Sequence, residues 1–336
     1  MSLTFKISLC LLFIALVSAI EDGSHFCPPS NLFPSQCQCD PYDRAINCFL
    51  YQEKEKQVFD IKKSLEKVGK HIQSSGHPAS YFSEFFLMCT SKVKTTVNLP
   101  EKTFGFLMFR KITIDKCNVD SIHPNAFGGS PMMTEYFNMR GNTIQPMAVN
   151  SLLKAITNMP TLRSIDLSYN NIETIPSNAF KALKNLTDLD LQGNDIKSIG
   201  DFAFAELSSL DLLNLDHNEI SSIKANSFAC QGSRNFRLVI SLNSNRLNSS
   251  SFENDCFASC KRPMLIEMDG NILNYLDENV FKSFLLTSKR NALHVRGNPI
   301  ECIDKNNWIK KYEIQLQYLL QLEITGSYWE CKTPKA

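Results

Sequence analysis

The sequence lacks a charge of one dominant sign. Among its 336 residues, 35 are Lys or Arg and 34 are Asp or Glu, and Lys6 is the only charged residue in the first 19 positions. The rest of the chain therefore has a formal charge of zero, which excludes a general basic surface for nucleic acid or anionic membranes. The content of 43% hydrophobic and 21% charged residues also excludes broad disorder.

Long hydrophobic runs and catalytic motifs are missing too. After the first segment, no stretch reaches the roughly 18 apolar residues that a membrane span needs. The sequence has no G-x-S-x-G, no H-E-x-x-H and no Walker-type phosphate loop. Its 6 histidines are dispersed, and none stands out at ligand spacing from a cysteine or carboxylate. We therefore expect no enzyme, no cofactor, no metal site and no membrane span.

The first segment predicts secretion. Lys6 precedes a mostly apolar run over 7–17, and small residues follow, with Val17 and Ala19 suitably placed for cleavage after Ala19. Such a run is too short to span a bilayer and is typical of a signal peptide. A buried N-terminal strand is the alternative. Because the far end is polar and shows no lipid-anchor signal, we expect a secreted, extracellular protein.

Cysteine is abundant, with 12 residues of this type. Cys10 lies in the signal segment, so 11 remain in an oxidising compartment, which is an odd number. The first four of these have C-x9-C-x-C-x8-C spacing, which indicates a cap with two bridges and three possible connectivities. A zinc site is the alternative, disfavoured by the spacing and by secretion. These four are Cys27, Cys37, Cys39 and Cys48.

An internal repeat is the strongest pattern in the chain. Segments beginning at Leu162, Leu186 and Leu210 fit L-x-x-L-x-L-x-x-N-x-L at every fixed position. The L-x-L core predicts a short strand with alternate side chains pointing inward, and the Asn amide can bond the backbone turn that leaves the strand. Including weaker copies, the positions of this Asn, called the ladder positions, are Cys117, Asn142, Asn170, Asn194, Asn218, Asn245, Asn271 and Asn298.

This pattern resembles the leucine-rich repeat family. The resemblance implies an α/β fold, namely a right-handed βα solenoid (horseshoe) of about nine coils with disulfide-tied N- and C-terminal caps. The expected layout is a signal peptide over 1–19, a cysteine-rich cap with an amphipathic helix over 20–80, repeats over 81–300 and a C-terminal cap over 301–336. Within the first cap, periodicity predicts a helix over 54–70.

The apolar face of that helix would carry Val58, Ile61, Leu65 and Val68. Lipid binding by the helix is an alternative, which its mixed charges disfavour.

The family resemblance also implies cap disulfides. The implied pairs are Cys27–Cys39, Cys37–Cys48 and Cys302–Cys331. In the C-terminal cap, Asp304 stands where the family has a further cysteine, so one bridge is expected there instead of two. Trp308 would help to seal the last coil.

Five cysteines remain after the caps are assigned: Cys89, Cys117, Cys230, Cys256 and Cys260. Cys117 occupies a ladder position, so we expect a buried thiol outside any bridge, with a bridge to Cys89 as the alternative. We expect one lateral bridge in the later coils, between Cys230 and Cys260.

The register predicts which side chains the concave face presents. One predicted row runs Lys111, Tyr136, Ser164, Asp188, Leu212, Val239, Leu265, Ala292, and the next runs Thr113, Asn138, Asp166, Asp190, Asn214, Ser241, Glu267, His294. Asp166, Asp188 and Asp190 would cluster on strands about 4.8 Å apart, where like charges are mildly destabilising. The cluster therefore predicts a site for a basic partner or a cation; ordinary solvated positions are the alternative.

Leu212, Val239 and Leu265 form a predicted apolar stripe beside the acidic cluster. An acidic patch next to an apolar stripe is plausible as a protein-binding surface. Asn185 and Asn248 are predicted glycan acceptors, Asn185 just before one strand and Asn248 just after another.

Several segments are similar to a narrower group of secreted arthropod leucine-rich repeat proteins. They include Thr103–Phe106, Ile112–Cys117, Ile122–Phe127 and Tyr275–Phe281. That group is itself similar to the non-catalytic subunit of Oplophorus-luciferin 2-monooxygenase, and the resemblance implies a binding or stabilising subunit without enzymatic activity.

We therefore expect a secreted scaffold that binds an extracellular protein through its concave face, with its oligomeric state open. The alternative is an innate-immune or cell-surface recognition module for glycans, lipids or microbial products.

Overall fold

The computed structural model describes most of the chain between Phe26 and Gln321. The ranges are 26–51, 58–75, 81–90, 96–128, 133–230, 236–254, 256–257, 260, 262–300, 307–312 and 320–321. The predicted signal peptide and the predicted Cys302–Cys331 bridge lie outside the described residues.

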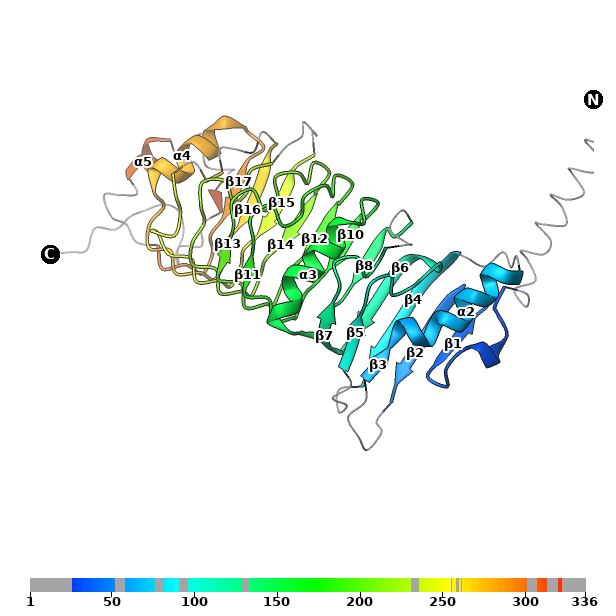
Figure 1. The fold of residues 1–336 in the computed structure, drawn as a ribbon. Helices are drawn as coiled ribbons and strands as arrows, with labels where there is room; N and C mark the ends of the chain where they lie inside the picture. The colour runs from blue at the N-terminus through cyan, green and yellow to red at the C-terminus, as the bar shows by residue number, and fades with distance from the viewer. Residues whose placement is uncertain are drawn as a thin grey trace, which may run out of the picture.

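One 12-stranded sheet runs along the described part of the chain. Its first pair is antiparallel, and every later neighbour is parallel, one strand for each coil (Figure 1). In spatial order the strands are β1 (Cys37–Asp40), β2 (Ala45–Leu50), β4 (Tyr81–Cys89), β6 (Met108–Asp115), β8 (Tyr136–Asn138), β10 (Ser164–Asp166), β12 (Asp188–Asp190), β14 (Leu212–Asn214), β15 (Leu238–Ser241), β16 (Met264–Glu267), β17 (Ala292–His294) and β18 (Leu320–Gln321). This is the predicted solenoid.

The return side of each coil is less regular. A four-stranded sheet contains β3 (Val58–Asp60), β5 (Thr96–Leu99), β7 (Asn118–Ile122) and β9 (Thr143–Ile144), and a two-stranded sheet contains β11 (Thr174–Ile175) and β13 (Ser198–Ile199). The helical segments are η2 (Ser30–Leu32), α2 (Ile61–Ser75), α3 (Pro146–Thr157), α4 (Glu278–Thr287) and α5 (Asn307–Lys311). The two 24-residue coils between ladder positions 170 and 218 return through turns, whereas the 28-residue coil before them holds α3.

Phenylalanine rings fill the return side of the core. Phe180, Phe204, Phe228 and Phe257 stack in sequence with ring centroids 5.7, 6.1 and 5.9 Å apart. All four are buried. Each of these four coils thus adds one ring to an apolar column that no coil could bury alone.

The ladder asparagines connect neighbouring coils through hydrogen bonds, as predicted. In Asn218, Nδ2 donates to Leu215 O of its own coil and to Leu191 O of the coil before, both at 3.0 Å. Its Oδ1 accepts from the backbone N–H of Ile196 at 3.1 Å. The same three-way pattern recurs at Asn194, Asn245, Asn271 and Asn298.

Asn170 departs from this pattern. Its Nδ2 donates normally, but its buried Oδ1 has no hydrogen-bond partner, because the N–H of Ile144 bonds the side chain of Asn171 instead. The preceding coil is the 28-residue coil that holds α3.

Every residue just before a ladder position has positive φ. Four of these residues are glycines, but Lys116, Tyr169, His217 and Ser244 adopt φ of 54–56° without being glycine. The tight turn that presents each ladder amide therefore requires the left-handed conformation, which is costly for residues with a Cβ.

The N-terminal cap contains the two disulfides that the family resemblance implies, Cys27–Cys39 and Cys37–Cys48. The helix prediction over 54–70 was wrong at both ends, since α2 runs over Ile61–Ser75. Helix α2 begins at Ile61 because the Asp60 carboxylate accepts the N–H of Lys63 at 2.9 Å and so caps the helix. Val58 therefore lies in β3 and is 65% exposed, while Ile61, Leu65 and Val68 are buried as predicted.

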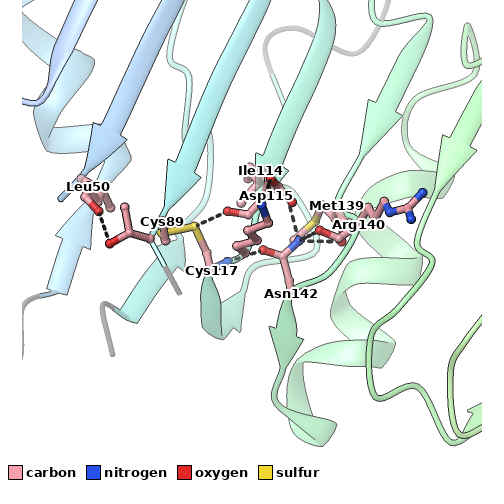
Figure 2. Close-up of a disulfide and its surroundings, with 10 residues drawn as sticks. Leu50, Cys89, Ile114, Asp115, Cys117, Met139, Arg140 and Asn142 are labelled. Carbon is pink, nitrogen blue, oxygen red and sulfur yellow. Dashed lines mark hydrogen bonds and ion pairs between the residues drawn. A yellow bond between two sulfur atoms is a disulfide. The ribbon is translucent and has the colours of Figure 1, made fainter. Parts of the chain in front are cut away.

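The later cysteines include one correction. Cys117 forms a disulfide with Cys89, so the expectation of a thiol outside any bridge was wrong and the alternative holds. Figure 2 shows this bridge between β4 and the turn after β6, with Asn142 on its other side accepting the Cys117 N–H at 2.8 Å. The disulfide thus joins the coils where the ladder has no further asparagine. Cys230 pairs with Cys260, as expected, and Cys256 is a buried thiol.

At the C-terminal end, Trp308 is 5% exposed and its Nε1 donates to Leu276 O at 2.9 Å. It seals the last described coil, as expected. No helix of the described residues is long and apolar enough to cross a membrane.

We predict that Asn218→Ala lowers the free energy of unfolding by about 3 kcal/mol, because it leaves the Ile196 N–H and two carbonyls unpaired in the core. Urea denaturation measures the loss. Asn279→Ala, on the exposed face of α4, is the control and should change stability by less than about 0.5 kcal/mol. Equal effects of the two variants would contradict the role of the ladder.

We predict that Ser244→Gly raises the free energy of unfolding by about 0.5 kcal/mol, because glycine adopts the positive φ at this position without strain. Ser283→Gly, inside α4, should lower it by a similar amount or more because glycine is a poor helix former. Thermal unfolding of both variants checks the sign, and a loss of stability in Ser244→Gly would refute the strain at this turn.

Candidate functional site

The face of the main sheet that points away from the core, here called the concave face, presents two rows of side chains. Strand register aligns Glu84, Lys111, Tyr136, Ser164, Asp188, Leu212, Val239, Leu265 and Ala292 in the first row, and Phe86, Thr113, Asn138, Asp166, Asp190, Asn214, Ser241, Glu267 and His294 in the second. From Lys111 and Thr113 onward, these rows agree with the rows predicted from the sequence.

The three predicted aspartates lie together on β10 and β12. Asp166 and Asp190 are direct register partners, and Asp188 lies one row away on the strand of Asp190. Asp188 is exposed and the other two are half-buried. In the described part of the chain, the Lys, Arg and His ion pairs involve other carboxylates. Within these ranges, the three aspartates thus form no ion pair with a Lys, Arg or His side chain.

The side chains of the second row have a structural task. The Oδ1 atoms of Asn138, Asp166, Asp190 and Asn214 each accept the backbone N–H two residues later, at 2.8–3.1 Å. Asparagine at 138 and 214 performs this task as well as aspartate at 166 and 190. The fold therefore requires an oxygen acceptor at these positions but does not require a negative charge.

The negative charge at Asp190 is disfavoured within the fold. Burial raises the pKa of the Asp190 carboxyl, and repulsion from Asp166 raises it further. The Gln192 N–H, the charge of Arg140 and the Asn214 amide act in the opposite direction but do not cancel the rise. Arg140 lies over the Tyr169 ring, 4.8 Å from its centroid.

The apolar stripe is narrower than predicted. Leu212, Val239 and Leu265 are register neighbours, as expected. Leu212 is 39% exposed and Val239 is half-buried, but Leu265 is only 7% exposed. A partner could therefore touch Leu212 and Val239 directly, while little of Leu265 is accessible.

Sequence reasoning missed a polar network in the later coils. Asp216 Oδ1 accepts from the Ser241 hydroxyl at 2.6 Å and from the Asn243 N–H at 2.7 Å. Asn243 Oδ1 accepts the Asp269 N–H, and Asp269 Oδ1 accepts the Arg296 N–H, each at 2.7 Å. The signal was present, because residues 216, 243 and 269 each stand two positions before a ladder residue.

A hydroxyl, a carboxylate and an imidazole meet at the end of the second row without forming a nucleophile–base pair. The Ser241 hydroxyl, which donates its proton to Asp216, lies 3.3 Å from Glu267 Oε2, and Glu267 Oε1 lies 3.3 Å from His294 Nδ1. The carboxylate stands between the other two groups, so the imidazole is not bonded to the hydroxyl that it would need to activate. Among the described residues, no three His, Cys, Asp or Glu side chains are grouped so that they could hold a metal ion.

Both predicted glycan acceptors are exposed. Asn185, just before β12, donates through Nδ2 to Pro160 O at 3.0 Å, and Asn248 accepts the Ser250 N–H at 2.8 Å. Asn185 shortly precedes Asp188 of the acidic cluster in the sequence. Between them, the Thr187 hydroxyl donates to Asp188 at 2.6 Å.

Comparison with known proteins supports the repeat architecture. The family described as "Leucine rich repeat" matches residues 153–196 and 184–233. A chain of the solved octameric complex of Latrophilin 3 (Lec, Olf), Unc5D (Ig, Ig2, TSP1) and FLRT2 (LRR) has 17% identity and a TM-score of 0.50, covering 86% of this chain and 92% of that one. No curated protein matches the chain. The chain thus contains leucine-rich repeats and has the fold of a leucine-rich repeat solenoid.

We predict that Asp190→Asn raises the free energy of unfolding at pH 7 by about 0.5 kcal/mol, because it removes a repelled charge and keeps the oxygen acceptor. The Asp190 carboxyl has a raised pKa in the folded state, so its contribution favours folding below its ordinary value of 3.8 and is lost as pH rises through the folded-state value. The advantage of the variant should therefore vanish at low pH. Denaturant unfolding between pH 3 and 7 tests this, and a destabilised variant at pH 7 would contradict it.

Proposed function

We propose that this protein is a secreted, non-enzymatic scaffold that binds another extracellular protein through its concave face. The contact would place a basic segment of the partner on Asp166, Asp188 and Asp190 and apolar side chains on Leu212 and Val239. A role as the stabilising subunit of a secreted complex, in line with the luciferase-subunit resemblance, is one form of this function.

One observation carries the proposal. At the second-row positions, the backbone accepts asparagine as readily as aspartate, as Asn138 and Asn214 demonstrate. Two adjacent coils nevertheless carry aspartate, although Asp166 and Asp190 repel one another. The fold does not require this repulsion between two aspartates. Such an unfavourable interaction is expected where a partner provides the compensating positive charge.

The surroundings of the cluster agree with a protein partner. Partly exposed Leu212 and Val239 lie next to the charges, and an apolar centre with a polar border is the usual anatomy of a protein interface. The four disulfides suit an extracellular site of action. The solved neighbour is itself part of a multi-protein complex.

Glycans at Asn185 and Asn248 are part of the proposal. A glycan at Asn185 would stand beside the strand that carries Asp188 and Asp190, so it would restrict the direction from which a partner approaches. The partner would then approach from the other border of the sheet.

We predict that the triple variant Asp166→Asn, Asp188→Asn, Asp190→Asn folds normally but binds its partner at least tenfold more weakly, because each charge pair at an interface contributes about 1 kcal/mol or more. The partner is first obtained by affinity capture from the native secreted fluid and identified by mass spectrometry. Titration of that purified partner then compares the wild type and the variant.

The control variant Asp120→Asn, Asp195→Asn, Asp201→Asn removes the same charge outside the concave rows. It should bind like the wild type, and wild-type binding should weaken with added salt and as pH falls through the raised pKa of Asp190. Unchanged binding by the concave triple variant would refute the proposed contact. Selective binding to a glycan array instead would favour the recognition-module alternative.

A further inference from the structure

Helix α2 and the turn Thr103–Phe106 enclose a hollow of about 170 Å³ in the N-terminal part of the solenoid. Helix α2 packs beside β5 of the four-stranded sheet, so the hollow is separate from the concave rows (Figure 1). The buried side chains of Leu65 and Phe104 form its walls. Its volume is close to the roughly 150 Å³ of an enclosed cavity that holds benzene in another protein, but this hollow is open to solvent on one side.

A glycine keeps this space open. Gly69 lies inside α2, where glycine costs about 1 kcal/mol relative to alanine. A Cβ built on Gly69 meets no atom within 4 Å, so packing does not demand a glycine here. Because Gly69 has no side chain, it leaves room in the hollow that it lines.

The edge of the hollow combines an exposed ring with positive charge. Phe106 lines the hollow and is 63% exposed, which is unusual for a large apolar side chain and leaves a surface that an apolar ligand could cover. Lys62 and Lys70 flank the opening along α2, and Glu66 stands between them, paired with Lys70 at 2.6 Å. The Lys62 ammonium donates one of its three hydrogens to Glu101 O at 2.9 Å, which leaves two for a ligand. A hydrogen bond and the charge of Lys70, with a smaller effect of Lys62, lower the pKa of Glu66. The three charged side chains therefore sum to a single positive charge.

We propose that this hollow binds an aliphatic carboxylate of about six carbons in all. The tail enters between Leu65 and Phe104 and over Gly69, Phe106 covers its outer side, and the carboxylate lies between the Lys62 and Lys70 ammonium groups. A medium-chain fatty acid and the C-terminal leucine of a peptide share this chemistry. Competition between the ligand carboxylate and Glu66 for Lys70 is a specific consequence of the geometry.

Calorimetric or ligand-observed NMR titration of the full chain with sodium hexanoate tests the proposal. Each methylene buried contributes about 0.8 kcal/mol, so hexanoate should bind about 15-fold more tightly than butanoate. Decanoate should gain less than about fourfold over hexanoate, because the hollow is then full. Hexanoate should also bind more tightly than 1-hexanol, and hexylamine should bind more weakly than either.

Two variants separate the ligand site from the fold. Gly69→Leu fills the hollow and should weaken hexanoate binding at least tenfold, while its thermal midpoint stays equal to or above that of the wild type because leucine is a better helix former. Lys67→Leu, on the exposed side of α2, is the matched control and should leave binding unchanged. Glu66→Gln frees Lys70 from its ion pair and should tighten hexanoate binding about two- to fivefold.

The two sources of the ligand are distinguished by N-acetyl-leucine. Tighter binding of hexanoate assigns the site to free fatty acids, and tighter binding of N-acetyl-leucine assigns it to a peptide C-terminus. The proposal is overturned if hexanoate does not bind, if it binds Gly69→Leu as well as the wild type, or if 1-hexanol binds as tightly as hexanoate. None of these results bears on the acidic cluster, so this proposal and the proposed function are tested independently.

Discussion

The hydrogen bonds of the ladder asparagines determine how one coil sits on the next. Each typical ladder amide donates to a carbonyl of its own coil and to a carbonyl of the preceding coil, and its oxygen accepts an N–H of that preceding coil. All of these groups lie where the main strand has ended and the sheet can no longer pair them. Without the ladder they would be buried and unsatisfied at every coil. The positive φ before each ladder residue and the stacked phenylalanine column both follow from the spacing that the ladder sets.

The ladder and the core determine which residues the fold accepts on the inner side of each coil. The two rows of the concave face are less constrained in residue type. The second row needs only an oxygen acceptor for a backbone N–H, and asparagine or aspartate can provide it. Charge can therefore vary from coil to coil with little effect on the fold. The acidic cluster on β10 and β12 is an example, since its aspartates repel one another and lower the stability of the fold only slightly. The hollow beside α2 follows the same logic, since Gly69 lowers helix stability and leaves space that packing does not require.

The repeat spacing was enough to predict the solenoid, both concave rows and the adjacency of Asp166 and Asp190, because strand register follows from the ladder positions. It could not predict the start of α2, which depends on the capping contact between Asp60 and Lys63. Nor could it decide between a thiol and a bridge at Cys117, because that choice depends on the distance to Cys89 in the neighbouring coil. The sequence could not show that asparagine and aspartate are equivalent in the second row, because that depends on the hydrogen bonds of their side chains. It could not show the hollow at Gly69 either, because that depends on how the surrounding side chains pack.

The most direct test of this account is native-state hydrogen exchange at the amides that donate to ladder asparagines. Apart from that of Cys117, which lies at the Cys89–Cys117 disulfide, these are the N–H groups of Ile172, Ile196, Ile220, Leu247 and Leu273. If the ladder holds the coils together, all five should exchange only through global unfolding, with a common free energy. The Ile144 N–H, which bonds Asn171 instead of the ladder, should exchange faster. Exchange of the five amides at different rates, or as fast as that of amides in the exposed turns, would contradict the account.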